Sequence, residues 1–96
     1  MFKQGCFKHG PPISYTAPAE LKKWPSLNNQ RQGGDRLPYL VFQGTLAECV
    51  DILMSKPVKA ISLYDIHTDH QPAFAQTVLS PADAAEIAMR WDFPRR

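Results

Sequence analysis

The stretch that decides the fold spans residues 39–53 and reads YLVFQGTLAECVDIL. Its first four residues favour β structure and a glycine soon closes them, which predicts a strand. Thr45 then stands three residues before Glu48, the spacing of a capping box, in which hydroxyl and carboxylate each accept from the other residue's backbone N–H. A helix is therefore expected from Thr45 to about Lys56, where Pro57 ends it. Its apolar stripe recurs at helical spacing and comprises Leu46, Cys49, Val50 and Leu53.

Strand and helix signals alternate again in the second half of the chain. Residues 58–66 predict a second strand, and residues 74–79 predict a third, which forms a hairpin with the second across a polar loop. Ser80, Pro81 and Asp83 predict a second helix, because serine caps, proline suits the first turn and an acid favours the N-terminus. The apolar stripe of this helix comprises Ala84, Ile87, Ala88 and Trp91.

The resulting order β-α-β-β-α predicts a small α+β domain, with a three-stranded sheet and two helices on one face. The connection between the first two strands is just long enough for a crossover, so these strands are expected either as parallel neighbours or on both sides of the third. The other sheet face has no helix, and Tyr39, Tyr64 and Ile66 are candidates to line it. Either the N-terminal segment or a second subunit would cover that face.

Residues 1–36 are expected to form an irregular basic arm, and residues 37–96 the compact α+β domain. Four of the nine prolines and four of the five glycines lie in the arm, where they disfavour regular structure. A short helix over 18–24 is the exception, because Pro18 suits a first helical turn and Pro25 stops the chain. The arm holds six lysines and arginines against two acids, whereas the domain holds five against seven. From the distribution of proline and glycine we expect the domain to fold without its arm.

Composition narrows the class of protein. No apolar run approaches the roughly 18 residues of a membrane span, and no apolar segment follows Lys3 and Lys8 as in a signal peptide, so a cytoplasmic protein without membrane contact is expected. Two cysteines are too few for a disulfide framework, and Cys49 is expected to be a small buried hydrophobe. A chain of 96 residues buries only about 60–65% of its unfolded surface, so association is an expected source of stability.

The densest group of polar residues comprises Asp65, His67, Asp69 and His70. Imidazoles and carboxylates close together can bind a divalent metal or exchange protons near neutral pH, so these four are the candidate binding residues. The competing interpretation is a solvated loop, in which histidine and aspartate make local turns.

A metal site of four ligands is the sharper hypothesis. Cys6 and His9 have the spacing C-x-x-H, and together with His67 and His70 they supply four ligand types that zinc prefers. A zinc ion would attach the arm to the domain. The pairing departs from the usual spacing of a cysteine pair followed by a histidine pair, and half-motifs of this kind also occur by chance.

No catalytic signature is present: the chain has no G-x-S-x-G, P-loop, G-x-G-x-x-G or H-E-x-x-H. The leading hypothesis is a non-enzymatic interaction or regulatory module, a homodimer or the binder of another protein, with no cofactor. One alternative is a nucleic-acid-associated regulator that uses the basic arm, and another is a small metal-dependent or acid–base enzyme that uses the loop from His67 to His70. The rival to the dimer is a monomer whose arm folds over the sheet through Phe2, Phe7, Tyr15 and Trp24.

Overall fold

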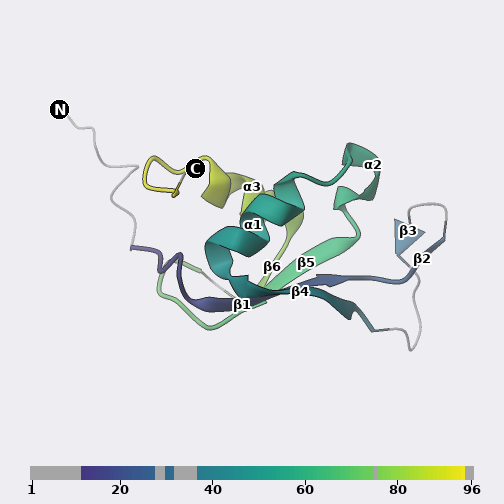
Figure 1. Ribbon diagram of the computed structural model, residues 1–96, viewed down its shortest axis with the longest axis horizontal. Helices are drawn as coiled ribbons and strands as arrows, with labels where there is room; N and C mark the ends of the chain where they lie inside the picture. Colours follow the sequence, from purple (N-terminus) through teal and green to yellow (C-terminus); the bar gives the residue numbers. More distant parts are fainter. Residues whose placement is uncertain (1–11, 28–29, 32–36, 75, 95–96) are drawn as a thin grey trace.

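The computed structural model describes residues 12–27, 30–31, 37–74 and 76–94 (Figure 1). Within them the elements follow one another as β1 (Pro18–Lys23), β2 (Ser26–Leu27), β3 (Gln30–Arg31), β4 (Tyr39–Thr45), α1 (Leu46–Met54), α2 (Val58–Ile61), β5 (Tyr64–Thr68), β6 (Val78–Leu79) and α3 (Pro81–Ala88).

The described strands form a four-stranded antiparallel sheet in the order β4-β1-β5-β6, and β2 and β3 form a separate two-stranded ribbon. Figure 1 shows α1 and α3 on the same side of the larger sheet, and both helices contact it and each other. The predicted α+β class is therefore confirmed, whereas the described residues form three helices instead of the two predicted. The prediction of three strands was wrong, because it lacked β1.

The helix predicted over 18–24 is wrong, because β1 occupies this stretch as a strand. Leu21 lies opposite Phe42 of β4 on one side and opposite Ile66 of β5 on the other. Side chains alternate across the strand: Ala19 and Leu21 are buried, whereas Glu20 and Lys22 are partly exposed. A strand with partners on both sides satisfies its backbone donors and acceptors in the sheet, and this outweighs a weak local preference for helix.

The segment expected as an irregular arm thus supplies the central strand of the sheet. A boundary at residue 37 does not separate an arm from the sheet, since β1 precedes that boundary and pairs with two strands that follow it. Residues 1–11, 28–29 and 32–36 of the expected arm lie outside the described residues.

The strand order also differs from both expected arrangements. β4 and β5 each run antiparallel to β1, so they run parallel to one another with β1 between them. The segment that contains α1 and α2 therefore crosses over β1 to join two strands that are not neighbours. This crossover places α1 over the sheet, where it contacts β1, β4 and β5.

The strand predicted over 58–66 begins late, and the strand predicted over 74–79 is shorter than expected. Val58–Ile61 form the single helical turn α2, in which the Ile61 N–H donates to the Pro57 carbonyl at 3.0 Å. The strand β5 begins only at Tyr64, and β6 contains only Val78 and Leu79. The β-branched residues Val58 and Ile61 favoured a strand, but Pro57 is the N-cap of a helical turn, and its carbonyl accepts from the Ala60 and Ile61 N–H groups.

The predicted capping box at Thr45 and the predicted N-cap at Ser80 are both confirmed. Thr45 Oγ1 accepts from the Glu48 backbone N–H at 3.2 Å, and Glu48 Oε1 accepts from the Thr45 N–H at 2.9 Å. Ser80 and Asp83 repeat the arrangement at 3.2 and 3.0 Å at the start of α3. The prediction that Trp91 belongs to the apolar stripe of the second helix was wrong: α3 ends at Ala88, and Trp91 is 67% exposed.

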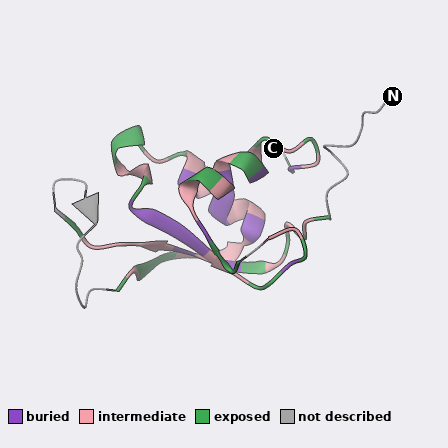
Figure 2. Cartoon of the chain, turned by 180° about the vertical axis from the view of Figure 1, so that it is seen from behind, coloured by how far each residue is buried: buried purple, intermediate pink, exposed green. Residues whose placement is uncertain are grey.

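The core lies between the helices and the sheet. Figure 2 shows buried residues along β5 and on the facing sides of α1 and α3. Tyr64 and Ile66, predicted to line the helix-free face, are buried on the helix side instead, because Ile66 shares a face with Leu21. The largest fully buried side chains are Leu21, Leu46, Leu53, Leu63, Ile66, Val50 and Cys49.

We expect Leu21→Ala to lower the free energy of unfolding by about 2–5 kcal/mol, since it leaves a cavity beside the central strand. Met89→Ala also cuts a long apolar side chain back to Cβ, but at a residue that is 80% exposed, and should cost well under 1 kcal/mol. Urea denaturation of both variants gives the comparison. Equal losses would show that β1 is not a central strand.

Candidate functional site

The candidate residues of β5 point away from the helices. Because Ile66 points into the core, Asp65 and His67 lie on the helix-free face, opposite Lys22 and Glu20 of β1. Asp69 and His70 follow the end of β5 and are exposed. The four residues predicted as one cluster are therefore distributed over a strand and a loop.

A shallow hollow on this face brings some of the candidates together. It has a volume of about 260 Å³, and His67 and Asp69 line it together with Glu20 and Gln43. Asp65 and His70 are not among its lining residues. The hollow thus pairs one imidazole with two carboxylates and excludes half of the predicted set.

Asp65 has a structural partner. Its carboxylate is 7% exposed and accepts a hydrogen bond from the Trp24 indole N–H at 2.6 Å. Such a bond to a charged acceptor is short and strong, and it satisfies an indole donor that would otherwise need water. The contact attaches the residue that follows β1 to the strand β5, so we assign Asp65 a structural role.

His67 has a half-buried ring with the Lys22 ammonium and the Asp65 and Glu20 carboxylates nearby. Burial lowers its pKa below the ordinary 6.5, and the nearby Lys22 ammonium lowers it further. Its Nε2 is buried without a hydrogen-bond partner among the described residues. The ring is therefore neutral at pH 7, the form that accepts a proton or binds a metal.

The described residues contain no group of three or more His, Cys, Asp and Glu side chains placed to hold a metal ion. Cys6 and His9 lie outside the described residues, so the four-ligand zinc site that joins them to His67 and His70 remains a prediction. Within the described part, the geometry offers a neutral imidazole beside carboxylates, without a metal centre.

Cys49 is confirmed as a buried hydrophobe. Its side chain is fully buried on α1, and burial raises its pKa to about 11, with a smaller contribution from the Glu48 carboxylate. A thiol that stays protonated at neutral pH is neither a nucleophile nor a ligand.

A side-chain cluster that the sequence did not reveal joins the two ends of the described chain. We call Tyr15, Arg90, Asp92 and Phe93 the terminal clasp. Tyr15 Oη donates to Asp92 Oδ1 at 2.7 Å and accepts from Arg90 Nε at 3.2 Å, and its ring meets the Phe93 ring edge-on at 5.4 Å between centroids. Hydrogen bonding from Arg90 lowers the Asp92 pKa, while burial raises the Tyr15 pKa.

Gln71 gives the clasp a second attachment. Its buried amide accepts from the Ser14 N–H at 2.7 Å and donates to the Ser14 carbonyl at 3.2 Å, as a neighbouring strand would. Tyr15 and Trp24 were predicted to attach the arm to the sheet, and both side chains do contact residues of the domain. Phe2 and Phe7 lie outside the described residues.

The most exposed apolar surface on the sheet lies at its outer edge. We call Leu37, Tyr39, Leu40 and Val41 the edge patch; their exposed fractions are 76%, 51%, 51% and 41%. Residues 39–41 belong to β4, which has β1 on one side and no strand on the other among the described residues. No residue of β4 is charged. Natural proteins usually protect an edge strand with charge, and β4 instead begins with four apolar residues.

Known proteins give no further indication of what this site does. Searches of protein-family models, of curated proteins and of solved structures gave no match. In the described ranges, no helix has the length and apolar character required to cross a bilayer.

We expect Tyr15→Phe to lower the free energy of unfolding by about 1–2 kcal/mol, because it removes the hydroxyl that bonds Asp92 and Arg90 and leaves the ring in place. Tyr39→Phe removes a hydroxyl from a half-exposed ring, and at a protein concentration low enough to give the single chain it should change the free energy of unfolding by less than about 0.5 kcal/mol. Urea denaturation at pH 7 measures both. If the two variants lose the same stability, the clasp hydroxyl contributes nothing.

The lowered pKa of His67 predicts a loss of stability in acid. Between the folded pKa and 6.5 the unfolded chain binds more protons at this ring, so its contribution is complete above pH 6.5 and declines as the pH falls through the folded pKa. NMR titration of the ring should give a lower midpoint in the folded than in the urea-unfolded protein. His67→Gln should weaken the pH dependence of the unfolding free energy below pH 6.5; an unchanged slope would contradict the assignment.

Proposed function

We propose that this protein is a non-enzymatic interaction module and that its edge patch binds a second copy of the same chain. The observation that supports this is the edge patch itself: four apolar side chains within five consecutive positions, at a sheet edge that no described strand pairs. The opposite edge strand, β6, has only two residues, so β4 is the longer of the two edges.

The patch extends over both sides of the strand. Successive residues of a strand point to opposite faces, so Tyr39 and Leu40 present apolar surface on different sides of the sheet edge. A partner in contact with both would bury apolar area on two faces and also meet the outward backbone groups of β4. Both contributions favour association.

A second copy satisfies these requirements with one symmetric contact. Two antiparallel β4 strands related by a two-fold axis would present the same side chains to each other, and an uncharged strand does not repel its own copy. Val41 is a bulge residue, since Leu21 pairs with Phe42 and Lys22 pairs with Leu40. The bulge interrupts a continuous ladder, so we assign most of the association energy to burial of the edge patch.

The two alternative functions have less support among the described residues. The ammonium groups of Lys23 and Lys56 lie 5.7 and 5.4 Å from the centroid of the Tyr64 ring, and Lys22 lies 3.7 Å from the Glu20 carboxylate. These lysines therefore have contacts within the protein rather than forming one free basic surface for phosphates. For an enzyme, the hollow at His67 provides an imidazole and two carboxylates, and the described residues contain no group of three such side chains placed to hold a metal ion.

We expect light scattering to give a mass that rises from one chain toward two as the protein concentration increases. Val41→Lys should weaken the dimer tenfold or more, because it places a charge in the contact. Val58→Lys is the matched control: it makes the same change at a side chain that is 88% exposed on α2 and should leave the dissociation constant unchanged. A mass of one chain at every concentration would refute the proposal.

A further inference from the structure

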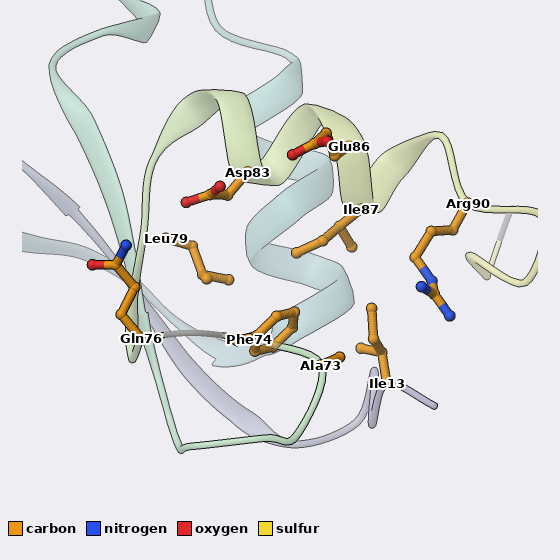
Figure 3. A pocket seen from close by; sticks show the side chains of 9 residues that line it. All are labelled: Ile13, Ala73, Phe74, Gln76, Leu79, Asp83, Glu86, Ile87 and Arg90. Carbon is orange, nitrogen blue, oxygen red and sulfur yellow. The ribbon is translucent and has the colours of Figure 1, made fainter. Parts of the chain in front are cut away.

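A pocket of about 370 Å³ lies between α3 and the segment that leads into β6 (Figure 3). Leu79, Ile87 and Phe74 form its apolar centre, and Ile13 and Ala73 extend it toward Arg90. Figure 3 shows Asp83 and Glu86 on the α3 side and Gln76 across from Asp83. The pocket is lined by five apolar and four polar or charged residues, and its volume is within the range of sites for small molecules.

The charges around the pocket favour a cation. Asp83 and Glu86 bring two carboxylates to its rim. The Arg90 guanidinium also lines it, but Asp92 accepts from Arg90 Nε at 3.1 Å and from Nη2 at 3.4 Å, so this positive charge is balanced within the terminal clasp. The group as a whole is therefore negative, and an anionic ligand would be repelled.

Asp83 takes part in the capping box of α3, but its carboxylate can still attract a cation at the rim of the pocket. One carboxylate oxygen of Asp83 accepts from the Ser80 N–H at 3.0 Å, which is one bond for a group with about four acceptor positions. Its charge remains at the rim, one helical turn from Glu86. A cationic group between these two carboxylates would leave an attached ring to lie over Phe74 and Ile87.

We propose that this pocket binds a small organic cation that carries an aromatic or branched apolar group. The ammonium lies at the rim with Asp83 and Glu86, and the apolar group replaces water over Phe74, Leu79 and Ile87. The site is separate from the edge patch, so it adds a ligand to the proposed interaction module and does not depend on the dimer.

Titration of the full-length protein with tryptamine, followed by amide NMR shifts, tests the site. Tryptamine supplies an indole and an ammonium, and we expect saturable shifts at Ile13, Phe74 and Ile87 with a dissociation constant of about 1 mM. Indole-3-propionate has the same ring and the opposite charge and should bind at least several-fold more weakly. Equal affinity of the two compounds, shifts that map elsewhere, or no saturable shift up to about 10 mM would each overturn the proposal.

Glu86→Gln removes one negative charge from the rim of the pocket and leaves its shape nearly unchanged. Glu86 is exposed and lies outside the capping box, so the variant should fold, and its affinity for tryptamine should fall about two- to five-fold while that for indole-3-propionate rises. Glu20→Gln makes the same change on the helix-free face of the sheet and should leave both affinities unchanged. An unchanged preference for tryptamine in Glu86→Gln would refute the role of the rim.

Discussion

Leu21 lies fully buried between Phe42 of β4 and Ile66 of β5, and the sheet depends on this row of three side chains. β1 pairs with a neighbour on each side, so its backbone hydrogen bonds are satisfied without water. With β1 in the middle, α1 crosses from β4 to β5 and covers the apolar row, and α3 packs beside it. The same arrangement leaves β4 at the outer edge, where the edge patch is exposed.

The features predicted correctly from the sequence are those that neighbouring residues determine. The capping boxes at Thr45 and Ser80 depend on groups three residues apart, so their spacing is sufficient to predict both helix starts. β1 was missed because Pro18, Glu20 and the spacing of Leu21 and Trp24 satisfy a helix equally well. Its strand conformation depends on partners in β4 and β5, which lie far along the chain, and local preference carries no information about them.

The candidate site was predicted only in part for the same reason. His67 and Asp69 do line one hollow, but Asp65 bonds the indole of Trp24, a contact that requires knowledge of β1. The strand character of residues 39–42 was evident, yet its position at the edge followed only from the order of the sheet. The terminal clasp and the pocket beside α3 both join residues near position 14 to residues near position 90, which no local pattern relates.

The order of the sheet has a consequence for the newly made chain. β1 and β4 leave the ribosome before β5, which follows only after α1 and α2 have been translated. Translation adds about 5–20 residues per second, so β5 is complete about 1–5 s after β4. Until then, the edge of β1 that will pair with β5 is unpaired, and the apolar edge of β4 is uncovered. During that interval both sides of the pair can be recognised by chaperones that bind exposed apolar strands, and only the arrival of β5 closes one of them.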